Sequence, residues 1–128
     1  LLTIFTLVFS MILSSNSFAE WAKVTRSVNG DTFYVDFERI RKVDGYVYWW
    51  RLDDFLEPNE RGIMSLKAYY KGDCGQNGII SLALIKFEQP MGEGKGETVD
   101  LSPIKLEWEF DRIGSGDMGL SYVCDYFN

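Results

Sequence analysis

The sequence predicts an α+β fold, in which an antiparallel β-sheet carries a C-terminal α-helix packed on one face. Three observations support this prediction. Short runs of alternating apolar and polar residues are separated by turn-forming residues, which is typical of half-buried antiparallel strands. Aromatic residues make up 16% of the chain, and aromatic side chains are enriched in strands. Near the C-terminus the apolar residues recur at helical spacing instead.

The first elements are expected around two turn sequences. Strands are predicted at 21–28 and 32–36, on either side of Asn29-Gly30-Asp31, which is a typical hairpin turn. One short helical turn is expected at 37–42. A second turn is expected at Asp44-Gly45.

The strongest predicted strand spans 46–55, and its residues divide into two faces. One face carries Tyr46, Tyr48, Trp50 and Leu52, and the other carries Val47, Trp49, Arg51 and Asp53. We expect Tyr48, Trp50 and Tyr70 to lie in the core. The remaining predicted strands are 62–71, 79–87 and 106–110, and a long mobile loop is expected at 89–102 because it is rich in glycine.

The predicted C-terminal helix has one continuous apolar stripe. Ser115 can cap its start, and Leu120, Val123, Cys124 and Phe127 lie at i, i+3, i+4 and i+7. The segment 79–87 is apolar on both faces, so a second layer should cover it. We expect the helix to supply that cover.

Residues 1–19 are predicted to be a signal peptide, followed by a single domain at 20–128. The run 1–13 is uncharged and mostly apolar, and it is shorter than the roughly 20 residues that span a membrane. Small residues at Ser17 and Ala19 predict cleavage between Ala19 and Glu20. An N-terminal truncation explains the missing initiating Met and positively charged start; an uncleaved membrane anchor is the alternative. No lipidation cysteine is seen.

The two cysteines, Cys74 and Cys124, both lie in the predicted mature domain. A disulfide between them agrees with export to an oxidising compartment, either the periplasm or the cell surface and medium. The alternative is a metal site, but two thiols without histidine make a poor zinc shell. We therefore predict no metal and no cofactor.

Composition argues against several function classes. The net charge of −6 lacks the basic footprint of a nucleic-acid-binding protein. The absence of histidine removes the usual catalytic triads. Two carboxylate pairs remain, Asp53/Asp54 and Glu107/Glu109, but the first pair points to opposite faces of a strand. Glu107 and Glu109 share a face, where alternating glutamates are usually solvated. No catalytic residue is predicted.

The order of motifs along the mature chain resembles the surface-adhesin protein E family of exported bacterial domains. The motifs are Trp21, TFYVDFERIRK at 32–42, WWRLDDF with the Pro58 loop, SLKAYYKGDC at 65–74, QPMGEGK at 89–95, Trp108 and GSGDMGLSYVC at 114–124. The resemblance implies an antiparallel sheet of about six strands with a C-terminal helix disulfide-bonded to it. It also implies adhesion through binding of host extracellular proteins.

Three function hypotheses follow. The first is a non-enzymatic binding module for extracellular or envelope proteins, the second a periplasmic structural or assembly factor, and the third a carboxylate-dependent hydrolase. The candidate partner-binding residues are Trp49, Arg51, Lys67 and Tyr69, because an aromatic side chain flanked by basic ones suits an interaction surface. The competing interpretation is that Trp49 packs under the helix and Tyr69 pairs across the sheet.

Overall fold

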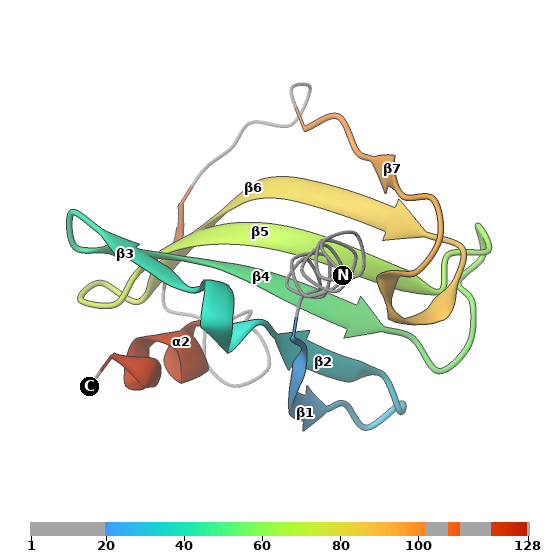
Figure 1. Cartoon of the computed structure of the whole chain (residues 1–128), viewed down its shortest axis with the longest axis horizontal. Helices are drawn as coiled ribbons and strands as arrows, with labels where there is room; N and C mark the ends of the chain where they lie inside the picture. Colours follow the sequence, from blue (N-terminus) through green and yellow to red (C-terminus); the bar gives the residue numbers. More distant parts are fainter. Residues whose placement is uncertain (1–19, 102–107, 111–118, 128) are drawn as a thin grey trace, which may run out of the picture.

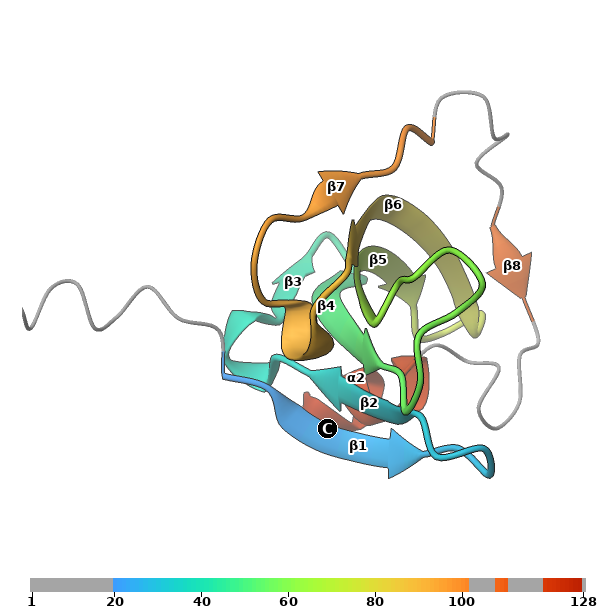
Figure 2. The same ribbon diagram turned by 90° about the vertical axis from the view of Figure 1, so that its right-hand side faces the viewer.

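The computed structural model describes residues 20–101, 108–110 and 119–127. Within these residues the strands form one antiparallel sheet whose main path is β1–β2–β4–β5–β6–β7 (Figure 1). Figure 2 shows from the side that the sheet is strongly curved. The strands are β1 (Ala22–Arg26), β2 (Thr32–Val35), β3 (Arg41–Val43), β4 (Tyr46–Asp54), β5 (Ser65–Asp73), β6 (Gly78–Phe87), β7 (Glu97–Thr98) and β8 (Glu109–Phe110).

Two strands, β3 and β8, lie outside that path and pair with strands inside it. β3 pairs with the start of β4, and β2 pairs with its end, so both lie along one edge of β4. β8 and β7 share one edge of β6 in the same way. The eight strands therefore occupy six positions across the sheet, which confirms the predicted antiparallel sheet of about six strands.

The segment after β2 differs from the single helical turn that the sequence suggested. A 3₁₀ turn, η2, covers only Phe37–Arg39, and the chain then enters β3. The reason is the hairpin between β3 and β4. Asp44 and Gly45 both have positive φ, 53° and 84°, which is the backbone that a tight two-residue hairpin turn requires. This turn brings Arg41 and Lys42 back against β4 as an edge strand.

The glycine-rich segment after β6 is held in place in its described part, which corrects the expectation of a long mobile loop. It contains the 3₁₀ turn η3 (Pro90–Gly92) and the strand β7. The backbone N–H of Met91 donates to Asp54 Oδ1 at 2.7 Å, and that of Gly92 donates to Ser65 Oγ at 2.8 Å. The Ser65 hydroxyl donates in turn to the carbonyl of Gln89 at 2.6 Å. These bonds fasten the segment to the ends of β4 and β5.

The helix α2 (Leu120–Tyr126) packs on one face of the sheet, as predicted. Leu120 and Val123 are buried in the main core, which also contains Val35, Val47, Trp49, Ala68, Tyr70 and Ile79. Phe127, the last residue of the expected stripe, is exposed. The predicted Ser115 cap and Glu107 lie outside the described residues.

The position of α2 differs in one respect from the prediction. In the sheet it contacts β4, and its Leu120 also approaches Gly72 of β5; the helix lies where β4 starts and β5 ends (Figure 1). Ile79 of β6 joins the core beside the helix, but Leu82 in the middle of β6 is 39% exposed. The helix therefore does not cover the whole 79–87 segment.

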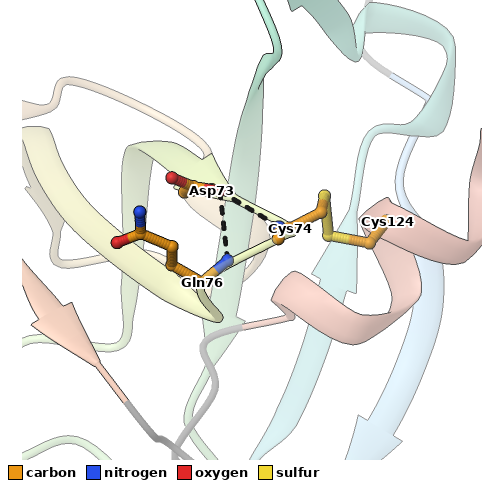
Figure 3. Close-up of a disulfide and its surroundings, with 5 residues drawn as sticks. Asp73, Cys74, Gln76 and Cys124 are labelled. Atoms are coloured by element: carbon orange, nitrogen blue, oxygen red, sulfur yellow. Dashed lines mark hydrogen bonds between the residues drawn. A yellow bond between two sulfur atoms is a disulfide. The ribbon is translucent and has the colours of Figure 1, made fainter.

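The predicted disulfide between Cys74 and Cys124 is confirmed. It joins the β5–β6 turn to α2, with the two Cα atoms 5.9 Å apart (Figure 3). Asp73 Oδ1 orders the turn by accepting hydrogen bonds from the backbone N–H groups of Gly75 and Gln76, at 3.0 and 3.2 Å. The helix is thus attached to the sheet both covalently and through its buried side chains.

Candidate functional site

The four predicted partner-binding residues do not lie together, because they belong to opposite faces of the sheet. Directly paired residues of neighbouring antiparallel strands point to the same side. Trp49 pairs with Tyr70 and Arg51 pairs with Ala68, on the face that α2 covers. Lys67 and Tyr69 lie on the other face, opposite Leu52 and Trp50.

Trp49 is a core residue, which corrects its assignment to an interaction surface. Its side chain is 0% exposed, and its ring centroid lies 5.5 Å from that of Tyr70. The helix closes over it because Gly72 leaves room. A Cβ at Gly72 would lie 2.5 Å from Leu120 Cδ1 and 2.8 Å from Trp49 Cζ3. The competing interpretation, that Trp49 packs under the helix, is confirmed.

Arg51 is also buried and has a structural role. Its guanidinium forms an ion pair with Asp53 and lies 4.2 Å from the centroid of the Phe33 ring. Burial raises the pKa of the Asp53 carboxyl, and the charge of Arg51 opposes this only in part. A buried arginine with these contacts is not available to a partner, which corrects its assignment to the binding site.

The other face of the sheet carries an ordered aromatic surface. We define the aromatic face as Tyr46, Tyr48 and Trp50 of β4 with Lys67, Tyr69 and Lys71 of β5. The Tyr69 ring lies between two others, 4.9 Å from the Trp50 centroid and 6.2 Å from the Tyr48 centroid. All six residues are half-buried, so each presents part of its surface to solvent. Lys67 and Tyr69 thus lie on an accessible face, as predicted. The tryptophan beside Tyr69 is Trp50, and not Trp49 as predicted.

The lysines of the aromatic face lie over aromatic rings. Lys71 Nζ is 4.2 Å from the Tyr46 centroid and 5.8 Å from that of Trp108. Lys67 Nζ is 5.0 Å from the Phe87 centroid and 5.9 Å from that of Trp21. Cation–π contacts of this kind hold the ammonium groups at fixed positions on the surface.

Among the described residues, two pockets open on this side of the sheet. One, of about 160 Å³, is lined by Arg41, Val43, Tyr48 and Tyr69. The other, of about 230 Å³, is lined by Trp21, Asp36, Arg39, Trp50, Lys67 and Ile85. A third pocket, of about 450 Å³, lies away from this face between the β1–β2 turn and the loop after β4, beside Asn29, Asp31 and Leu56.

The carboxylate pair considered for catalysis is separated, as the alternation along the strand predicted. Asp53 forms an ion pair with Arg51, whereas Asp54 accepts a hydrogen bond from the backbone of Met91 on the opposite side of the strand. In the part of the chain that the structure describes, no group of three or more metal-ligating side chains gathers. Nor does that part contain a helix long and apolar enough to cross a membrane.

The sequence that forms this sheet, helix and disulfide matches a known family. The family model described as surface-adhesin protein E matches residues 21–124. This chain belongs to the surface-adhesin protein E family. The match runs from the residue before β1 to the second cysteine of the disulfide, so it includes every described strand and the first part of α2.

Solved structures of Haemophilus influenzae protein E have the same fold as this family member. Crystal form II matches with a TM-score of 0.64 at 13% identity, over 88% of this chain and 94% of that one. The selenomethionine form matches with a TM-score of 0.62 at 12% identity, over 86% and 89% of the two chains. No curated protein matches the sequence. At such identities the likeness shows the fold alone.

Sequence reasoning missed Asp36. It also assigned Tyr48 and Trp50 to the core of this protein E-family domain, whereas both are half-buried on the aromatic face. The two sets of alternating residues in β4 are both rich in aromatic side chains, so hydrophobicity alone did not distinguish them. Gly72 is the signal that could have done so. It lies opposite Val47 on the face where Leu120 approaches, and a strand glycine often marks such a close approach.

Proposed function

We propose that this domain is an exported, non-enzymatic binding module that binds an extracellular or cell-envelope protein through the aromatic face. Membership of an adhesin family supports a binding role. The choice of this surface rests on the row Tyr48, Tyr69 and Trp50. Its rings contact one another, are half-buried and are flanked by lysines. Large aromatic side chains contribute most of the binding energy in many protein interfaces.

The side chains of the aromatic face are held in place by contacts with one another, and this favours binding. Rings that already contact one another lose little side-chain freedom when a partner covers them, and this lowers the entropic cost of association. Lys67 and Lys71, with Arg41 on the adjacent β3, place positive charge on this side of a chain whose net charge is −6. A partner with an acidic or hydrogen-bond-accepting surface would complement it.

The side chains that could perform acid–base chemistry support this non-enzymatic role. The chain has no histidine, and its two cysteines are joined. Asp53 and Asp54 lie on opposite faces and are each bonded within the fold. A carboxylate-dependent glycoside hydrolase would need two carboxylates facing one reacting bond.

Site-specific photocrosslinking tests this proposal. A photoreactive phenylalanine analogue is placed at Tyr69, and the exported protein is irradiated with intact cells and, separately, with extracellular-matrix extracts. The matched control carries the analogue at Tyr122, a tyrosine on α2 that is 46% exposed. We expect a discrete protein adduct from position 69 only.

The result has a clear contrary outcome. If both positions give the same adducts, or if position 69 gives none with cells or matrix, the aromatic face is not the binding surface. Adducts only with envelope proteins of the producing cell would support the binding surface and would favour an assembly role over adhesion to extracellular proteins. A substitution of Trp50 by Ala should remove the position-69 adduct without unfolding the domain.

A further inference from the structure

The pocket of about 230 Å³ contains an unusual carboxylate. Asp36 follows β2 and is 1% exposed, and among the described residues neither of its side-chain oxygens accepts a hydrogen bond. Asp36 forms an ion pair with Arg39, whose Nε lies 3.4 Å from Oδ2 and whose side chain is 48% exposed. A carboxylate can accept about four hydrogen bonds. Asp36 is therefore a residue of the pocket lining whose acceptor positions no described residue fills.

The charges around the pocket favour a neutral ligand. Arg39 and Lys67 line it together with Asp36. A cation that approached Asp36 would also approach these two positive groups, and an anion would meet the buried carboxylate. Glu20 and Glu38 interact with each other nearby but are exposed, so solvent screens their charges. The pocket is thus suited to a molecule that carries hydrogen-bond donors and acceptors without net charge.

The apolar residues that line the pocket limit the class of ligand further. Trp21 and Trp50 contribute indole rings, and Ile85 adds an aliphatic surface. The volume is below the range of about 300–1,000 Å³ that is usual for drug-sized ligands, so it suits one small ring. A pyranose has a flat C–H face for an aromatic ring and several hydroxyls that both donate and accept hydrogen bonds.

We infer that this pocket binds one neutral sugar unit of a glycan. The sugar's C–H face packs against Trp21 or Trp50, one or two hydroxyls donate to Asp36, and other sugar oxygens accept hydrogen bonds from Lys67 or Arg39. A neutral amide side chain of a protein partner fits less well, because it offers few donors and acceptors and no broad apolar face. This inference goes beyond the proposed function, although Trp50 and Lys67 also belong to the aromatic face.

Saturation-transfer NMR on the exported, processed protein tests the inference. The probes are glucose, galactose, mannose and N-acetylglucosamine, with N-acetylneuraminic acid as the anionic comparison and Nα-acetyl-arginine amide as the cationic one. We expect saturable binding of at least one neutral sugar. Asp36→Asn should weaken it roughly tenfold or more, because hydrogen bonds to a charged acceptor are among the stronger ones.

The control is Asp53→Asn, the same change in a carboxylate on the opposite face of the sheet, which should leave sugar binding unchanged. Trp50→Leu provides a second test if Asp36→Asn fails to fold, and it should also abolish binding. Binding of a charged probe in preference to every neutral sugar would overturn the inference. So would a crystal structure of the processed protein in which its own amino terminus is hydrogen-bonded to Asp36.

The two proposals fail in different ways. If no sugar binds while position 69 still crosslinks to a protein, the sugar site is wrong and the protein-binding surface stands. If a sugar binds in an Asp36-dependent manner and no protein adduct forms at position 69, the sugar site stands and the protein-binding surface is wrong.

Discussion

Gly72 of β5 lies directly beneath Leu120 of α2. A Cβ at this position would be 2.5 Å from Leu120 Cδ1, closer than real side chains approach. The absence of a side chain at Gly72 thus sets how near the helix sits to the sheet. We expect Gly72→Ala to lower the free energy of unfolding by about 1–3 kcal/mol, because the helix must shift or the core must repack.

Urea unfolding followed by circular dichroism measures this effect. Gly75→Ala is the matched control, because its nearest neighbour, Asp73 Oδ1, would lie at an ordinary contact distance of 3.5 Å. The control should change stability little. Equal stability of the two variants would show that the helix does not depend on this close approach.

Trp49 and Tyr69 should respond in opposite ways to truncation. Trp49→Ala removes a fully buried ring and should cost about 3–5 kcal/mol of stability. Tyr69→Ala removes a half-buried ring from the open face and should cost much less, while it abolishes partner capture. A thermal-unfolding series on both variants tests this. A larger loss of stability for Tyr69→Ala would assign it a core role.

The disulfide should matter for the attachment of α2. It closes a separation of 50 residues, for which the entropic model gives about 4 kcal/mol. Cys74→Ser with Cys124→Ser is expected to lower stability by about 2–4 kcal/mol and to raise amide exchange in α2 before the sheet. Hydrogen exchange with mass spectrometry resolves these segments. Unchanged exchange in α2 would mean that Leu120 and Val123 suffice to hold the helix.

Asp53 gives a pH dependence of defined sign. Its pKa is raised in the fold, mainly by burial, so the folded state takes up a proton at higher pH than the unfolded state does. The stability of the protein relative to an Asp53→Asn variant should therefore increase as the pH falls from neutrality through the folded pKa. Below the unfolded pKa, near about 3.9, the difference should become constant.

Denaturant unfolding of both proteins between neutral pH and about pH 3.5 measures this difference. A relative gain in stability as the pH rises would show that the Arg51 ion pair outweighs the burial of Asp53.

If residues 1–19 are a signal peptide, the exported protein has a defined N-terminus. Cleavage between Ala19 and Glu20 should give a protein that starts at Glu20. This residue is next to Trp21, which lines the pocket that we propose binds a sugar. Intact mass spectrometry of the exported form checks this directly. Retention of residues 1–19 in that form would contradict both the cleavage site and the assignment of this segment as a signal peptide.

Part of the candidate site was predictable because strand alternation is a local property. The alternating pattern of β4 is enough to separate Trp49 and Arg51 from Tyr48 and Trp50. The pattern of β5 likewise places Lys67 and Tyr69 together. Alternation within a strand says nothing of the register between strands. It therefore allows Trp49 to be grouped with Tyr69, although Trp50 is the actual partner of Tyr69.

The sequence by itself determined most of the strands along the chain, the two sets of residues in β4, the C-terminal helix and the pairing of two cysteines. The strands and the helix follow from periodicity and turn residues, which are properties of one segment of the chain. The disulfide follows from the cysteine count, because two cysteines can pair in only one way. The tertiary structure decided which face of β4 is covered. Both faces carry aromatic residues, so burial favours neither alone. The helix covers the face with Gly72, because only there can Leu120 reach the sheet, and the aromatic face remains open as a result.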